Sequence, residues 1–156
     1  MEKAPTIDQC KFCEAGKYSS KRAMFEIDAC KDCQQGKFSL QVAADHISSC
    51  LKCPLGYFSI PSRSRDKECV GCEAGYFIAR RGSYLPCREC PSGYHKTEIN
   101  GSSCEFCLPG MTQPSIGRAD CKNCIPGKMM KNLKSVECLD CVTGMYQPFV
   151  GQASCK

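Results

Sequence analysis

Cysteine is the residue in this sequence with the greatest capacity for chemistry. The chain of 156 residues contains 17 cysteines, about one residue in nine. Sixteen of them form Cys-x-x-Cys pairs, at Cys10 and Cys13, Cys30 and Cys33, Cys50 and Cys53, Cys69 and Cys72, Cys87 and Cys90, Cys104 and Cys107, Cys121 and Cys124, and Cys138 and Cys141; Cys155 follows alone. Pairs with this spacing can ligate zinc, act as a redox-active dithiol or supply the halves of structural disulfides.

The composition favours cross-linking. A cysteine share above roughly 8–10% in a short chain is typical of a disulfide scaffold. The hydrophobic fraction of 42% includes the cysteines, aromatic residues make up 8%, and tryptophan is absent. A chain with so few large apolar residues cannot build a continuous interior, so we expect covalent bonds to hold it in shape.

The cysteine pairs recur in a repeat that also contains glycine. Successive first cysteines are 20, 20, 19, 18, 17, 17, 17 and 17 residues apart. A glycine stands three residues after each second cysteine, at Gly16, Gly36, Gly56, Gly75, Gly93, Gly110, Gly127 and Gly144. Two residues later lies an aromatic slot, filled by Tyr18, Phe38, Phe58, Phe77 and Tyr146, and by His95, Thr112 and Met129 in the other repeats. A second glycine slot lies ten or eleven residues after the cysteine, at Gly82, Gly101, Gly117 and Gly151.

The glycines indicate tight turns between cross-links. Cys-Pro-Leu-Gly at 53–56 and Cys-Pro-Ser-Gly at 90–93 predict type I turns, with proline second and glycine fourth. Leu-Pro-Gly at 108–110 and Ile-Pro-Gly at 125–127 predict type II turns. A short extended piece should follow, with its aromatic ring over the nearest disulfide, before the second glycine reverses the chain. Helix is not expected, apart from one possible turn at 23–27.

The predicted fold class is therefore small and disulfide-rich. We expect an elongated tandem array of short β and irregular repeats, with little helix and no central core. Residues 1–9 would be an N-terminal edge, and residues 10–156 would hold eight repeats of about 17–20 residues. Stacked repeats of this kind should contact only their neighbours.

One pairing scheme uses all but one of the cysteines, although a sequence does not establish connectivity. In this hypothesis the second cysteine of each pair bonds the first cysteine of the next. The bonds are Cys13–Cys30, Cys33–Cys50, Cys53–Cys69, Cys72–Cys87, Cys90–Cys104, Cys107–Cys121, Cys124–Cys138 and Cys141–Cys155. Cys10 is then unpaired within this chain.

Zinc binding is the main alternative. Cys10, Cys13, Cys30 and Cys33 have the spacing of a four-cysteine zinc site, and grouping in fours leaves only Cys155 over. An array of four-cysteine zinc sites would place the protein inside the cell. The uniform repeat favours disulfides, because zinc ribbons combine two different knuckles. A redox enzyme is less consistent, since it needs one reactive pair at a helix start. We therefore predict no catalytic residues, no cofactor and no metal.

The remaining features suit a protein outside the cell. Twenty-one basic and 16 acidic residues alternate along the chain, for a net charge of +5, so we predict protein partners and no nucleic acid. No window has 18 apolar residues, so this segment should not insert into a membrane. The first residues lack the apolar run of a signal peptide, and we expect a piece of a longer secreted or cell-surface protein. His46 should be an exposed loop residue, His95 a packing substitute, and Asn100 a possible glycosylation site within Asn-Gly-Ser.

The motif resembles a known family. Cys-x-x-Cys-x-x-Gly-x-[Tyr/Phe]-Ser, with a later glycine, is similar to the ephrin-receptor-like cysteine-rich repeat, which is related to modules of tumour-necrosis-factor receptors and of the growth-factor-receptor cysteine-rich superfamily. The segments 107–121 and 141–155 match it best, whereas the first three repeats have two or three extra residues and no second glycine. The resemblance implies an extracellular rod with the disulfide pairing given above, acting as a stalk or protein-binding module. It does not imply ephrin binding.

Overall fold

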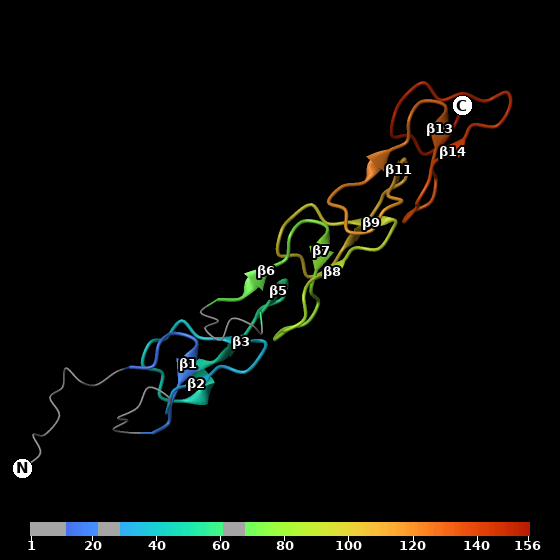
Figure 1. The fold of residues 1–156 in the computed structure, drawn as a ribbon. Helices are drawn as coiled ribbons and strands as arrows, with labels where there is room; N and C mark the ends of the chain where they lie inside the picture. The colour runs from blue at the N-terminus through green and yellow to red at the C-terminus, as the bar shows by residue number, and fades with distance from the viewer. Residues whose placement is uncertain (1–11, 22–28, 61–67) are drawn as a thin grey trace, which may run out of the picture. The chain divides into compact units, whose positions relative to one another are not determined.

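The computed structural model describes residues 12–21, 29–60 and 68–156, and within them it contains short strands and turns (Figure 1). The strands are β1 (Lys17–Tyr18), β2 (Lys31–Asp32), β3 (Lys37–Phe38), β4 (Leu51–Lys52), β5 (Tyr57–Phe58), β6 (Val70–Gly71), β7 (Tyr76–Phe77), β8 (Arg88–Glu89), β9 (Tyr94–His95), β10 (Glu105–Phe106), β11 (Met111–Thr112), β12 (Lys122–Asn123), β13 (Lys128–Met129) and β14 (Leu139–Asp140). The described residues contain the 3-10 turn η3 (Ile47–Ser49) and no α-helix. The fold is a small, disulfide-rich tandem repeat, as the sequence predicts.

The chain divides into two compact units. The first comprises Met1–Val70 and Arg81–Pro86, and the second comprises Gly71–Arg80 and Cys87–Lys156. Residues 1–9, Cys10 and the possible helical turn at 23–27 lie outside the described residues. No helix in the described part of the chain is long and apolar enough to cross a membrane.

Six of the repeats close on a two-stranded antiparallel ladder. The residues after the first glycine pair with the two residues inside the next Cys-x-x-Cys. In the first unit β1 pairs with β2, so that Lys17 lies opposite Asp32, and β3 pairs with β4. In the second unit β7 pairs with β8, β9 with β10, β11 with β12, and β13 with β14. The ladder of each repeat therefore ends at the cysteines that cross-link it.

All eight turns after the second cysteine have one geometry, which corrects the sequence prediction for two of them. The residue after each glycine donates its N–H to the carbonyl three residues back, as Met111 does to Leu108 over 3.0 Å. The glycine is thus the third turn residue, and its φ of +77° to +87° makes the turn type II. Type II is correct for 108–111 and 125–128. Type I is wrong for the two Cys-Pro repeats, because Pro54 and Pro91 are the first turn residues, not the second.

In five repeats the same glycine joins its repeat to the next through two backbone hydrogen bonds. Its N–H donates to a carbonyl in the following repeat, and its carbonyl accepts from the second cysteine of that repeat. For Gly110 these bonds reach the Met130 carbonyl at 2.7 Å and the Cys124 N–H at 2.8 Å. Equivalent pairs form at Gly16, Gly75, Gly93 and Gly127. These buried polar groups are paired, as a folded backbone requires.

The second slot is defined by a backbone conformation with positive φ, and residues other than glycine also occupy it. The residue ten positions after the second cysteine has φ between +58° and +70° in the six repeats where it is described: Ala43, Gly82, Asn100, Gly117, Lys134 and Gly151. Each donates its N–H to the carbonyl of the second cysteine of the preceding repeat, over 2.7–3.1 Å. Assigning Gly101 to this slot is therefore wrong, because Asn100 occupies it. Asparagine tolerates this conformation, and the inter-repeat hydrogen bond holds alanine and lysine in it as well.

Contacts extend beyond neighbouring repeats, contrary to expectation. A Cβ built at Gly36 would overlap the carbonyl of Gly82, two repeats further along in the same unit. In the second unit a Cβ at Gly75 would overlap the carbonyl of Gly117, and one at Gly110 that of Gly151. Glycine is required at these positions because two backbones approach closely there. The repeats that contain these glycines consequently contact the repeat two positions along as well as the next one.

Sulfur takes the place of a hydrophobic core. The second cysteines Cys53, Cys90 and Cys107 are 0% exposed, and most of the buried apolar residues in the described part of the chain are cysteines. The aromatic slot was expected to supply the shielding, but Tyr18, Phe38, Phe58 and Phe77 are only half-buried and Tyr146 is 63% exposed. The fully buried side chains lie one position further along, where Ser39 and Ser59 are each 1% exposed.

Candidate functional site

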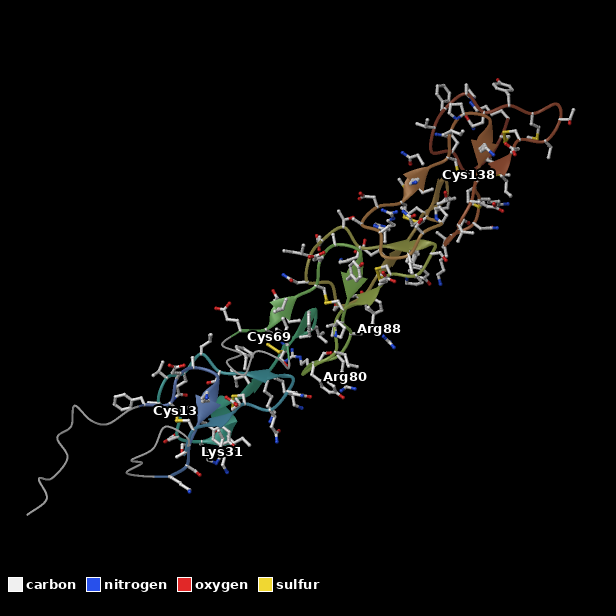
Figure 2. The ribbon with its side chains drawn as sticks, in the orientation of Figure 1. Cys13, Lys31, Cys69, Arg80, Arg88 and Cys138 are labelled. Atoms are coloured by element: carbon white, nitrogen blue, oxygen red, sulfur yellow. A yellow bond between two sulfur atoms is a disulfide. The ribbon has the colours of Figure 1, made fainter. Side chains whose placement is uncertain are left out.

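The cysteines of the described residues are joined in eight disulfides (Figure 2). They are Cys13–Cys30, Cys33–Cys50, Cys53–Cys69, Cys72–Cys87, Cys90–Cys104, Cys107–Cys121, Cys124–Cys138 and Cys141–Cys155, the same pairs as in the sequence hypothesis. The Cα–Cα distances of 5.6–5.8 Å lie at the centre of the range that a disulfide spans. So many disulfides indicate an oxidising environment such as the extracellular space.

The sulfurs in these bonds are not thiolates, which are the form that attacks a substrate or ligates a metal. In the parts of the chain that the structure describes, no three His, Cys, Asp or Glu side chains are grouped so that they could hold a metal ion. The chemistry of the described cysteines is therefore cross-linking.

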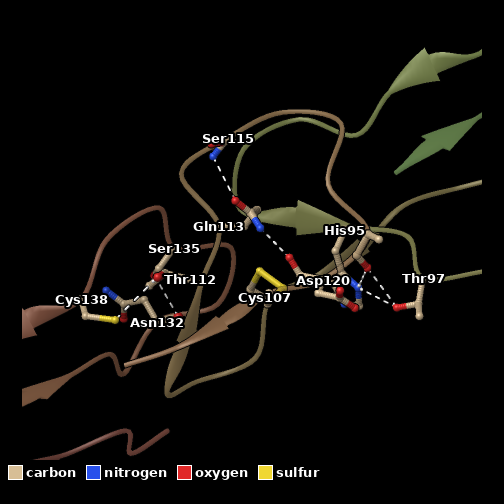
Figure 3. The surroundings of a disulfide bond; sticks show 12 residues. His95, Thr97, Cys107, Thr112, Gln113, Ser115, Asp120, Asn132, Ser135 and Cys138 are labelled. Carbon is tan, nitrogen blue, oxygen red and sulfur yellow. Dashed lines mark hydrogen bonds between the residues drawn. A yellow bond between two sulfur atoms is a disulfide. The ribbon is translucent and has the colours of Figure 1, made fainter. Parts of the chain in front are cut away.

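A buried polar slot, which sequence reasoning missed, follows the aromatic slot in five repeats, at Ser19, Ser39, Ser59, Gln113 and Gln147. In the repeat that begins at Cys107 it holds Gln113, which is 2% exposed (Figure 3). Its Oε1 accepts from the Ser115 N–H at 3.1 Å, and its Nε2 donates to the Asp120 carbonyl. Gln147 makes the equivalent bonds to Phe149 and Ser154 at 3.2 and 2.6 Å. The recurrent Ser19, Ser39 and Ser59 in the same slot are the signal that could have revealed it.

The two histidines differ in environment. His46 is exposed, as predicted, and its Nδ1 accepts from the Ser48 N–H at 3.2 Å, which caps η3. His95 is half-buried in the aromatic slot, and its Nδ1 lies 3.1 Å from the Ala119 carbonyl (Figure 3). Since a carbonyl only accepts, Nδ1 carries the proton in this bond. Thr97 Oγ1 donates to the same carbonyl at 3.0 Å. His95 and Thr97 thus both bind Ala119, which belongs to the next repeat.

The strongest ion pair beside His95 joins Lys96 to Glu105. Lys96 Nζ lies 2.8 Å from Glu105 Oε1 and 3.6 Å from Glu98 Oε2. The hydrogen bond to Glu105 raises the pKa of Lys96, and the same bond from Lys96 lowers the pKa of Glu105. Both groups are therefore charged across the neutral pH range, and the pair joins the residue that follows β9 to the partner strand β10.

The side chains vary at the contacts between a repeat and the second repeat after it, although the backbone geometry there is constant. We define a junction triad as the residue after the first glycine, its partner opposite in the ladder, and the positive-φ residue two repeats further along. Four triads lie within single units: Lys37, Lys52 and Gly82; Tyr76, Glu89 and Gly117; Tyr94, Phe106 and Lys134; and Met111, Asn123 and Gly151.

Each junction triad has its own chemistry. Tyr76 donates its hydroxyl to Glu89 at 3.4 Å. Lys134 Nζ lies 5.5 Å from the centre of the Tyr94 ring and 6.0 Å from that of Phe106, which is a cation–π arrangement. The backbone of the repeats thus presents different side chains in the same geometry.

The loop 79–85 and the glycosylation sequon at Asn100 both contain residues that take part in the fold. Within the loop 79–85, Gly82 belongs to the positive-φ slot and Ser83 is 8% exposed, so these two residues are part of the fold. Asn100 is half-buried and has a φ of +60°, with its backbone N–H bonded to Cys72 at 2.7 Å. Its side chain is the group that glycosylation would modify.

Comparison with known proteins gives no relative from which a function could be transferred: no family model and no curated protein matches the chain.

Proposed function

We propose that this chain is a non-catalytic spacer and protein-interaction module of a secreted or cell-surface protein. The observation that carries the proposal is the contrast between constant and variable positions in the repeats. Cysteines, glycines and the buried polar slot keep one backbone geometry, while the junction triads change from repeat to repeat. Eight disulfides in an oxidising environment support the extracellular location. The resemblance to ephrin-receptor-like cysteine-rich repeats points to the same role.

A recurrent exposed aliphatic side chain supports binding to proteins. The position nine residues after the second cysteine holds Val42, Ile99, Ile116, Leu133 and Val150, which are 48–67% exposed. One exposed apolar residue needs no explanation, but the four of these residues that lie in the second unit offer a partner a recurring set of apolar contacts. Proteins are accordingly the partners that we propose, and we propose neither nucleic-acid binding nor membrane insertion for this segment.

Small-angle scattering of the intact chain tests the spacer role. A globular protein of this length has a radius of gyration of about 15 Å. We expect a value well above this, because a spacer must hold its two ends apart. A radius near the globular value would contradict the proposal.

Peptide mapping without reduction, together with metal analysis, tests the alternative of an intracellular array of four-cysteine zinc sites. We expect the eight disulfides and no stoichiometric metal in protein purified without chelators. One zinc ion per four cysteines, together with the absence of disulfides, would replace the extracellular proposal with the intracellular one.

A further inference from the structure

We propose that the Lys37–Lys52 junction triad, together with Arg81, is a binding site for sulfated glycans. The site lies within the first unit, on β3, on β4 and on the residue that precedes Gly82. The choice of a glycan rests on the extracellular location proposed above, whereas the site itself rests on the charges described below.

Two lysines face each other here without a counter-charge. Lys37 lies directly opposite Lys52 in the β3–β4 ladder. In the described residues neither lysine forms an ion pair with a carboxylate. Like charges directly opposite in an antiparallel pair destabilise it, so this arrangement has a cost in the free protein.

The fold does not require that cost. At the same ladder position in other repeats Lys17 forms an ion pair with Asp32 at 3.4 Å, and Lys128 forms one with Asp140 at 2.8 Å. An aspartate therefore fits where Lys52 stands. The lysine is a departure from a pairing that the repeat makes elsewhere.

Arg81 is a second departure toward positive charge at the same place. It occupies the position that is aliphatic and exposed in five other repeats, and it is itself exposed. The stem of Lys52 passes the next residue, with its Cγ 3.5 Å and its Cδ 3.6 Å from where a Cβ of Gly82 would be. The backbone segments that carry Lys37, Lys52 and Arg81, from three repeats, thus meet at Gly82.

The backbone beneath these cations is held by hydrogen bonds. Gly82 donates to the Cys53 carbonyl at 2.8 Å, Cys53 donates to the Gly36 carbonyl at 2.9 Å, and Gly36 donates to Ser59 Oγ at 2.6 Å. The positive groups are therefore presented on a constrained surface, and less freedom is lost when an anion binds. Sulfate groups repeated along a sugar chain offer several negative charges to such a cluster at once, whereas an isolated ion offers one.

Binding of the intact chain to immobilised heparin tests the site. The key variant is Lys52→Asp, which recreates the opposite-charge pair of Lys17 and Asp32 and should therefore fold. The matched control is Lys122→Asp, because Lys122 is also an exposed ladder residue and the change in net charge is the same. We expect Lys52→Asp to weaken heparin binding by about tenfold, a loss typical of a charge-assisted contact, and the control to change it by less than about twofold. Arg81→Gln, at an exposed position, provides a second variant that leaves the ladder intact.

Equal losses in Lys52→Asp and Lys122→Asp would overturn the proposal, since they would reflect general charge attraction. Absence of heparin binding by the wild-type chain would overturn it as well. Desulfated heparin is the test of sulfate recognition and should bind weakly. Duplex DNA bound as tightly as heparin would contradict the glycan assignment while leaving the spacer proposal untouched, because scattering and peptide mapping test that role separately.

Discussion

At the scale of single residues, the first glycine of each repeat has two separable roles, left-handed backbone and close approach. Gly110 and Gly127 have nearly the same φ, +85° and +82°. A Cβ at Gly110 would overlap the Gly151 carbonyl, whereas at Gly127 nothing in the described residues lies within 4 Å. The pair therefore allows strain and steric overlap to be measured independently.

We predict that Gly110→Ala destabilises the protein more than Gly127→Ala. The second substitution should cost about 1 kcal/mol, from left-handed strain alone. The first should cost at least about 1 kcal/mol more, because the overlap forces two backbones apart. Urea unfolding of the disulfide-intact variants checks this, and equal losses would contradict the packing of the Gly110 repeat on the one two positions away.

The buried polar slot provides a second residue-scale prediction. Met130 occupies in the next repeat the slot that Gln113 fills, and it is 5% exposed. Gln113→Met therefore keeps a side chain that the slot accepts and removes only the hydrogen bonds to Ser115 and Asp120. We expect a loss of about 1–3 kcal/mol for leaving these backbone groups unpaired. Faster hydrogen exchange at the Ser115 amide would accompany it, while unchanged exchange and stability would show that the amide contributes nothing.

At the scale of the structural element, the disulfide loops differ in how well their sulfurs are protected from solvent. Cys141 and Cys155 are both half-exposed, whereas Cys107 is 0% exposed. Thiol exchange requires access to a sulfur, so accessible bonds react first.

We therefore predict that limiting reductant opens Cys141–Cys155 before Cys107–Cys121. Alkylation of the new thiols, followed by peptide mapping, orders the bonds. Labelling of Cys107 and Cys121 ahead of Cys141 and Cys155 would show that burial does not control their reduction.

At the scale of the whole molecule, the protein depends on covalent closure of its loops. A cross-linked loop of about 15 residues contributes roughly 3 kcal/mol in the chain-entropy model. No cluster of large apolar side chains in the described residues offers an alternative, because the buried set consists mainly of cysteines and small or polar residues.

We expect complete reduction without denaturant to unfold the chain. Collapse of the amide proton dispersion in an NMR spectrum would record it, and reoxidation should restore the native spectrum. A reduced chain that keeps its dispersed spectrum, with or without added zinc, would invalidate the structural role assigned to the disulfides.

The amino-acid sequence by itself determined the repeat and the fold class, and it predicted the pairing of cysteines that the structure contains. These features depend on residue types at constant spacing. The recurring cysteine pairs indicate cross-links, and the glycine three residues after each pair indicates a turn. The type II turns at 108–111 and 125–128 were also readable, because proline and glycine occupy adjacent turn positions.

Only the tertiary structure decided which conformation each slot adopts and what each slot contacts. Ala43, Asn100 and Lys134 take the positive-φ backbone because an N–H bond to the preceding repeat stabilises it, and no residue type reveals such a bond. In the two Cys-Pro repeats, the ladder that follows the turn likewise determines which residue is first in the turn, and the proline does not. The Lys37–Lys52 pair and its position beside Gly82 depend on strand register and on stacking over two repeats. Contacts between residues 15 to 46 positions apart are set by packing, to which local sequence preference contributes little.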